Sequence, residues 1–141
     1  MPREQFIVIV GCGRLGRHLA NHYSREGHSV MAVDVDPARL AKLAPEYSGF
    51  RLEGDATEPA VMKQSHAEDA DRLIAVTGYD NVNLAVAQVA RTIFGVPDVV
   101  ARVNDPEREA IFQELGIRTV CPLTLAAREL VAWQTRSVDS G

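Results

Sequence analysis

Short apolar segments rich in β-branched residues alternate with amphipathic stretches six times along the chain. The first segment, Phe6–Val10, shows no polar alternation, which indicates a strand buried on both faces of a sheet. The other predicted strands are residues 29–33, 50–53, 72–77, 98–103 and 118–121. Short strand–helix connections favour parallel strands joined by right-handed crossovers, with helices on both faces. The sequence therefore predicts one doubly wound, Rossmann-like α/β domain whose six-stranded parallel sheet has the order 3-2-1-4-5-6.

Helices are predicted between these strands from their caps and apolar periodicity. Asp36 and Asp105 each precede a proline, a pairing that supplies an N-cap carboxylate and a first helical residue that needs no N–H partner. Thr57 is the expected cap of the helix that follows the third strand. The expected helices are 14–26, one from 37, one after 57, 81–94, 105–116 and 124–135. Residues 1–141 are expected to form a single domain with a frayed tail at 137–141.

A glycine-rich turn follows the first strand and opens the first helix. Gly11 permits a tight turn, Gly13 lets a pyrophosphate approach the backbone, and Gly16 lets the helix pack close to the strand. The free N–H groups and the positive end of that helix would then face phosphates. The candidate binding residues of this segment are Gly11, Cys12, Gly13, Arg14, Leu15 and Gly16.

An acidic residue at the end of the second strand completes the dinucleotide-binding fingerprint. Asp34 stands there, where its carboxylate can accept hydrogen bonds from both ribose hydroxyls and would repel a 2′-phosphate. No arginine follows at once, because Val35 and Asp36 come next. We therefore expect NAD(H), AMP, ADP or ATP as ligand and not NADP(H). The alternative is a glycine-rich turn in a fold that has lost its ligand.

Composition narrows the functional classes. The 15 Lys and Arg residues are outnumbered by 19 Asp and Glu, which argues against a nucleic-acid partner. No apolar stretch approaches the roughly 20 residues that span a bilayer, so we expect no direct membrane insertion. The two cysteines, Cys12 and Cys121, favour a reducing, cytoplasmic location.

Cys12 lies at a helix N-terminus, which would lower the pKa of its thiol. A redox role is possible, but we favour a small side chain that fills a tight turn.

Further segments match the pattern of one family of regulators. Arginine follows the second glycine of the loop, and Gly-Asp-Ala-Thr follows the third strand at 54–57. The other matching segments are 27–36, 75–77, 101–104 and 115–117. In these motifs the chain resembles the nucleotide-binding N-terminal domain of the RCK/KTN family, the TrkA-N type regulators of potassium transport. The resemblance covers nearly the whole chain, and full subunits of the family usually continue into a second, smaller domain.

The resemblance assigns roles by matched position. It implies that residues 11–15 hold the phosphates, with Arg14 reaching those of its own ligand or of a neighbouring subunit. It also implies that Asp34 binds ribose and that Asp55 and Ala56 border the adenine. The plainer interpretations are that the Arg14 side chain is solvated and that Asp55 terminates the third strand.

Two more residues come from the other half of the predicted sheet. The resemblance places Thr77 beside the topological switch point, and it implies that Arg102 reaches the phosphates or a second ribose. The plainer interpretations are that Thr77 supplies a turn hydroxyl and that Arg102 is a surface ion-pair partner. Some ATP-binding members carry a glutamate just after the sixth strand that helps to hold a cation. Leu123 stands at that place here, so we expect no metal site.

Two helical segments indicate association between subunits. The segment 81–94 is apolar nearly all round. A helix that packs on one face of a sheet needs only an apolar stripe, so the far side of this helix is expected to meet another subunit. The last helix carries further apolar residues, and the resemblance implies that it crosses to a neighbour. We therefore expect a homodimer or a larger ring, with a membrane potassium transporter or channel subunit as partner.

The function expected from these features is regulatory. The resemblance implies a nucleotide-sensing subunit that gates a potassium channel or transporter, peripheral to the inner face of the cell membrane through its partner. We expect no enzyme, because spacing suggests no catalytic constellation and no segment is left for a substrate site. The alternatives are the cofactor-binding part of an NAD-dependent oxidoreductase and the cytosolic domain of a cation/proton antiporter.

Overall fold

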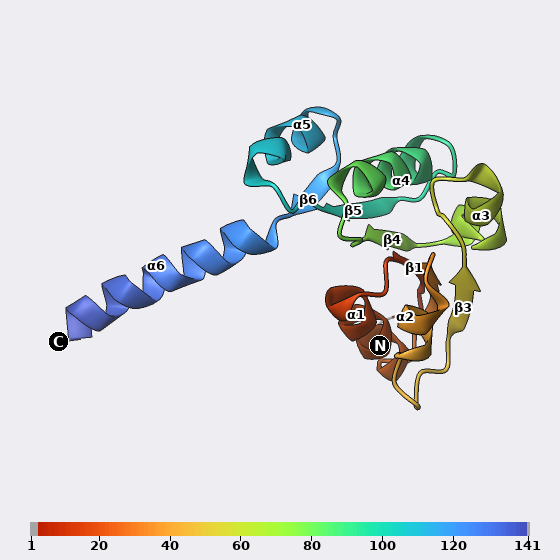
Figure 1. Ribbon diagram of the computed structural model, residues 1–141, viewed down its shortest axis with the longest axis horizontal. Coiled ribbons are helices and arrows are strands. Elements are labelled where there is room, and N and C mark those ends of the chain that lie inside the picture. The colour runs from red at the N-terminus through yellow and green to blue at the C-terminus, as the bar shows by residue number, and fades with distance from the viewer. Residues whose placement is uncertain (1–2, 141) are drawn as a thin grey trace.

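The six predicted strands form one parallel sheet in the predicted order. The computed structural model describes the backbone of residues 3–140 and the side chains of residues 3–133. The strand order is β3-β2-β1-β4-β5-β6, and every neighbouring pair is parallel. Helices cover both sides of the sheet (Figure 1). The prediction of a doubly wound, Rossmann-like fold is confirmed.

Most element bounds differ from the predicted ones by only one or two residues. The strands are β1 (Phe6–Val10), β2 (Ser29–Asp34), β3 (Phe50–Glu53), β4 (Arg72–Ala75), β5 (Asp98–Arg102) and β6 (Arg118–Val120). The α-helices are α1 (Arg14–Arg25), α2 (Pro37–Ala41), α3 (Pro59–Gln64), α4 (Asp80–Thr92), α5 (Glu109–Glu114) and α6 (Pro122–Ser140). The 3-10 turns are η1 (Ala67–Asp69) and η2 (Pro106–Arg108).

The core consists of two apolar layers, one on each face of the sheet. Ile7 and Ile9 of β1 face α1 and α2, whereas Val8 and Val10 face α3 and α4. The first three of these residues are fully buried. This arrangement confirms that an apolar strand without polar alternation is covered on both faces. It also fixes β1 in the middle of the sheet, next to the point where the strand order reverses.

Two of the predicted helix starts are confirmed and one is wrong. The Asp36 and Asp105 carboxylates accept hydrogen bonds from backbone N–H groups two residues on, as N-caps do. After Asp105, however, the chain forms η2 before α5 rather than one continuous helix. Thr57 does not cap α3, whose N-cap is Glu58. The Thr57 hydroxyl instead donates to Asp55 Oδ1 at 2.6 Å, so a local turn competes successfully with the cap.

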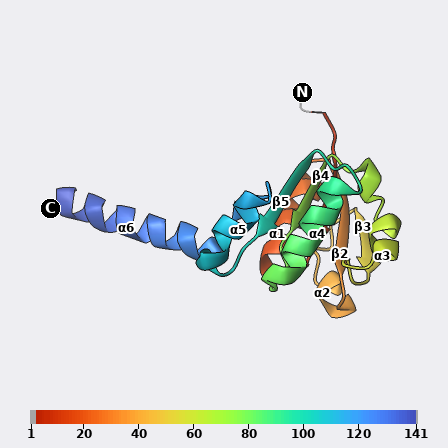
Figure 2. The ribbon, with the colours of Figure 1, turned by 90° about the horizontal axis from the view of Figure 1, so that it is seen from above.

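The helix α6 extends away from the body of the domain (Figures 1 and 2). It begins two residues before the predicted start, and its backbone is helical to Ser140. Fraying at 137–141 stays a prediction, and Gly141 lies outside the described residues. The large apolar side chains that α6 exposes are Leu123, Leu125, Leu130, Val131 and Trp133. None of the helices in the described part of the chain is long and apolar enough to cross a bilayer.

The helix α4 buries most of its apolar surface within the domain. Val86, Ala87 and Ala90 are fully buried in the core layer between α4 and the sheet. Val82 and Leu84 pack against the same layer and are partly buried. The apolar composition of the segment is therefore largely explained by the packing of the domain itself, whereas α6 exposes several large apolar side chains.

Candidate functional site

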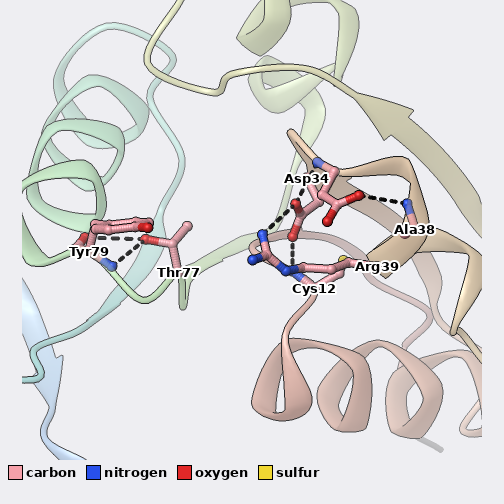
Figure 3. Close-up of polar contacts among 7 residues, drawn as sticks. Cys12, Asp34, Ala38, Arg39, Thr77 and Tyr79 are labelled. Atoms are coloured by element: carbon pink, nitrogen blue, oxygen red, sulfur yellow. Dashed lines mark hydrogen bonds and ion pairs between the residues drawn. The ribbon is translucent and has the colours of Figure 1, made fainter.

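The candidate site lies at the carboxyl ends of the central strands. The turn between β1 and α1 stands beside the end of β2 on one side and the end of β4 on the other. Ligands of doubly wound folds bind at this reversal of strand order. Figure 3 shows the two halves of the region, with Cys12, Asp34 and Arg39 in one half and Thr77 and Tyr79 in the other.

The three fingerprint glycines have different geometric reasons to be glycine. Gly11 has a φ of +102°, and a Cβ there would lie 2.8 Å from the backbone nitrogen of Thr77. A Cβ on Gly16 would overlap the carbonyl oxygen of Gly11, so α1 can pack this close to β1 only with glycine. A Cβ on Gly13 would meet nothing within 4 Å. The open space above Gly13 is where a ligand can approach the backbone.

The amides of the turn divide into two sets. Gly11 N–H donates to the Val33 carbonyl at 2.8 Å, and Cys12 N–H donates to Asp34 Oδ2 at 2.7 Å. The N–H groups of Gly13, Arg14 and Leu15 have no acceptor among the described residues. They are the first amides of α1, which an α-helix leaves without an internal partner. An anion held there would also meet the positive end of the helix dipole.

Arg14 extends from this helix start into solvent. Its side chain is exposed and forms no ion pair with the residues that the structure describes. A cation at a helix N-terminus is unfavourable unless an anion is present. The position of Arg14 therefore fits a residue that meets a bound phosphate.

Asp34 is almost completely enclosed, with 4% of its side chain exposed. Oδ1 accepts from the Asp36 amide at 2.8 Å and from Arg39 Nη1 at 3.3 Å, while Oδ2 accepts from the Cys12 amide (Figure 3). A carboxylate offers about four acceptor positions. Three are used here, so a ribose that binds through both hydroxyls must displace one donor. The Arg39 contact is the longest of the three.

The expectation that Cys12 has a lowered thiol pKa is wrong. Burial, and then the charge of Asp34, raise the pKa of Cys12 to about 12 and outweigh the opposing influence of nearby guanidinium groups. The side chain is fully buried on the α1 face of the sheet. Cys12 thus contributes its amide to the site, and its thiol fills the core.

The turn after β3 holds Asp55 and Ala56 near the end of β2. Gly54 N–H donates to the Asp34 carbonyl at 3.0 Å, which joins the two strand ends. Asp55 is exposed, and hydrogen bonds from the Thr57 hydroxyl and amide lower the pKa of its carboxyl group. The Ala56 side chain is buried in the core. The structure therefore brings both residues to the strand end that carries Asp34, and a contact with adenine stays a prediction.

Asn83, which the sequence analysis did not select, organises the other half of the site. Its Oδ1 accepts from the Thr77 hydroxyl at 2.6 Å and from the Thr77 amide at 2.9 Å. Its Nδ2 donates to the carbonyls of Thr77 and Arg102 at 3.0 and 2.9 Å. The Arg102 side chain, predicted to reach the ligand, donates from Nε to Asn104 Oδ1 at 2.7 Å. The signal for Asn83 was a single polar residue within an otherwise apolar helix stripe.

Asp80 holds the loop that follows β5. Its carboxylate accepts from the Asn104 amide at 2.6 Å and from the Asp105 amide at 3.1 Å. Burial raises the pKa of Asp80, but these backbone bonds and the Asn104 side chain together outweigh it, so the pKa is lowered. An open hollow of about 420 Å³ lies beside these residues. Its lining is Gly78, Tyr79, Asp80, Asn81, Asn104, Asp105 and Arg108.

Potential metal ligands gather elsewhere in the described part of the chain. His66, Glu68 and Asp69 have ligand atoms within 4.8 Å of one another, and all three are exposed. They belong to η1 and its cap, at the amino-terminal end of β4 and so at the opposite edge of the sheet from the glycine turn.

Comparison with known proteins places the chain in a family. Residues 7–122 match the model of the TrkA-N domain. A Streptomyces coelicolor relative named Trk system potassium uptake protein TrkA is 38% identical over 125 residues, which are 89% of this chain and 56% of the relative. The chain thus spans about half the length of that relative.

Solved structures share the fold at lower identity. The Shewanella denitrificans Kef C-terminal domain in its AMP-bound form has a TM-score of 0.77 and 21% identity, over 89% of this chain and 76% of that one. The GsuK channel bound to NAD has a TM-score of 0.71 and 21% identity, over 88% of this chain and 23% of that one. With its family model matched from β1 to the start of α6, the chain belongs to the TrkA-N domain family.

Proposed function

We propose that the chain is a nucleotide-sensing regulatory domain of a potassium transport system. Its ligand is NAD(H) or an adenine nucleotide, bound at the carboxyl ends of β1 and β2. The observation that carries the proposal is the pairing of the unpartnered amides at the start of α1 with the buried Asp34 carboxylate. The names of the relatives point to potassium uptake, and structures of the same fold have been obtained with AMP and NAD.

The site residues divide between the parts of such a ligand. The amides of Gly13, Arg14 and Leu15 hold the phosphates. The Arg14 side chain places a positive charge beside the phosphates of its own ligand or of the ligand in a neighbouring subunit. Asp34 binds the adenosine ribose, for which it has one unused acceptor position and one weakly held donor. Asp55 borders the adenine.

The remaining predicted residues serve the second part of a dinucleotide. Thr77 and Arg102 stand at the ends of β4 and β5, next to the open hollow. Their side chains are held by Asn83 and Asn104, so in this arrangement they shape the site and contact a ligand only at its edge. No step of the proposed function needs a reacting group, and we propose a regulatory and not a catalytic role.

Regulation follows if the nucleotide favours one arrangement of associated subunits. A ligand shifts such an equilibrium only by its difference in affinity for the two arrangements. The exposed apolar residues of α6 support association into a homodimer or a larger ring, because a projecting helix with an apolar surface is stabilised when a neighbour covers it. The partner is a membrane potassium transporter or channel subunit, bound at the cytoplasmic face of the membrane.

Calorimetric titration of the purified chain tests the binding proposal. NADH, NAD⁺, ATP, ADP and AMP are titrated into the native chain and into Asp34→Ala, with Glu53→Gln as the matched control. Glu53 is exposed and pairs in register with Asp34 on the neighbouring strand, so its substitution removes a nearby carboxylate and keeps the hydrogen bonds of Asp34. Binding that is lost in Asp34→Ala and kept in Glu53→Gln supports the proposal. Absence of binding by every nucleotide refutes it.

A further inference from the structure

A guanidinium group stands beside the carboxylate that would select the ribose. Arg39 follows Asp34 by five residues, and α2 turns it back so that Nη1 lies 3.3 Å from Asp34 Oδ1 (Figure 3). The Arg39 side chain is 48% exposed, so a ligand at the ribose position can reach it. The exclusion of NADP(H) from the sequence rested on the Asp34 charge and on the absence of an arginine directly after it. The structure supplies that arginine from the next helix.

Arg39 is held only through Asp34. The ion pair with Asp34 is its sole side-chain partner among the residues that the structure describes. Arg51, a second guanidinium of this region, donates to the Leu40 carbonyl and stacks over the Tyr47 ring at 5.0 Å. Arg51 is thus held by groups other than Asp34, whereas Arg39 is free to change partner.

The carboxylates that neighbour Asp34 along the chain and across the sheet, Asp36 and Glu53, form no contact with the Arg39 side chain in the described structure. The Asp36 carboxylate accepts from the Ala38 amide at 2.9 Å and so caps α2. The Glu53 side chain is exposed and forms no hydrogen bond or ion pair with the described residues. Asp34 is therefore the group that neutralises Arg39. An arginine beside a ribose is the group that accommodates a 2′-phosphate in this fold, because its planar donors match phosphate oxygens.

From this geometry we propose that Asp34 and Arg39 together determine whether the site accepts a ribose with or without a 2′-phosphate. Asp34 excludes a 2′-phosphate by its own charge and by occupying the guanidinium that would bind it. The arginine needed for NADP(H) is already in place, so removal of the Asp34 charge alone converts the site from NAD(H) to NADP(H) preference. This inference rests on the proposed function, because it concerns the ligand of that same site.

The test compares ligands that differ only in the 2′-phosphate. NADH is compared with NADPH, and 5′-AMP with 2′,5′-ADP, by calorimetric titration of the purified native chain, Asp34→Asn and Asp34→Asn/Arg39→Gln. Asparagine keeps the size of the side chain and an acceptor oxygen for one of the two loop amides, those of Cys12 and Asp36. Glu53→Gln and Lys42→Gln are the charge-matched controls, since both side chains are exposed and Lys42 ends the same helix.

The native chain is expected to prefer NADH, and Asp34→Asn to prefer NADPH by about tenfold or more, the usual size of one charge-assisted hydrogen bond. The double variant is expected to lose this gain. An unchanged preference in Asp34→Asn, or NADPH binding that survives Arg39→Gln, overturns the inference while NADH binding by the native chain still upholds the proposed function. If the native chain binds none of the ligands, both fail.

A second variant keeps the test decisive if Asp34→Asn does not fold. Arg39→Gln in the native background removes the charge that neutralises Asp34, so it is expected to weaken the binding of 2′,5′-ADP, measured at millimolar concentration, and to leave the binding of 5′-AMP unchanged or tighter. Equal effects on the two ligands overturn the inference. Thermal unfolding of each variant shows which of them are folded before titration.

Discussion

Asn83→Ala is the substitution for which the structure gives the most definite prediction. The Asn83 side chain is fully buried and joins the end of β4 to the end of β5. It takes part in four hydrogen bonds of 2.6 to 3.0 Å, with the Thr77 hydroxyl, the Thr77 amide and the carbonyls of Thr77 and Arg102. Alanine removes all four and leaves backbone groups of both strand ends without a partner.

The expected loss of stability follows from these bonds. Each contributes about 0.5–1.5 kcal/mol net, so the four together correspond to about 2–6 kcal/mol. Thr77 is half-buried, and water can reach part of the freed surface, which places the expected loss at about 2–4 kcal/mol. Native domains have about 5–15 kcal/mol of stability. The variant should therefore still fold, with a clearly lower free energy of unfolding.

Urea unfolding followed by circular dichroism measures this loss. Asn81→Ala is the matched control, because Asn81 lies on the same helix, is exposed, and accepts one hydrogen bond from Arg108. Its expected effect is about 0.5 kcal/mol or less. A loss below about 1 kcal/mol for Asn83→Ala, or equal losses for the two variants, would refute the bonding scheme and the connection that the Asn83 side chain makes between the ends of β4 and β5.

Three further predictions concern other parts of the site. Gly16→Ala should destabilise the fold by about 1–3 kcal/mol through overlap with the glycine turn, whereas Gly78→Ala, with open space around it, should not; urea unfolding compares them. The lowered pKa of Asp80 stabilises the fold above about pH 4, and this contribution is lost as pH falls through the folded pKa, so Asp80→Asn should flatten the acid side of a pH–stability profile. Cys12 should resist iodoacetamide at pH 8 until urea unfolds the chain, because its thiol has a pKa of about 12; mass spectrometry detects the label.

The sheet could be predicted because its signals are local and numerous. Phe6–Val10 is apolar throughout, so its place in the middle of the sheet follows from the need to cover both faces. The handedness of the crossovers then places helices on both faces of the sheet, as the dinucleotide-binding order 3-2-1-4-5-6 requires. The Thr57 cap failed for a local reason as well: Asp55 accepts both the hydroxyl and the amide of Thr57, and the proline at 59 starts α3 from Glu58.

The site was predicted only in part, because its contacts are made between elements. The spacing from Gly11 to Asp34 identifies the strand ends that meet, but not the donors that surround the carboxylate. Arg39 reaches Asp34 only because α2 reverses the chain, and five residues of sequence separation give no sign of that contact. The Cys12 thiol shows the same limit: its position at a helix start suggests a low pKa, and burial reverses the sign.

The two halves of the site differ in how far they are formed before a ligand binds. Asp34 is enclosed and bonded to the Cys12 amide, so the carboxylate that we propose binds ribose and the turn that we propose binds phosphates are held against each other. The half beside Tyr79 is an open hollow, and the Tyr79 side chain is 72% exposed. A preformed surface loses less entropy on binding. The adenosine half should therefore supply most of the affinity for AMP, ADP and NAD(H) alike. If ligands have different regulatory effects, we expect the difference to arise in the open half, where Asn83 joins Thr77 after β4 to Arg102 at the end of β5.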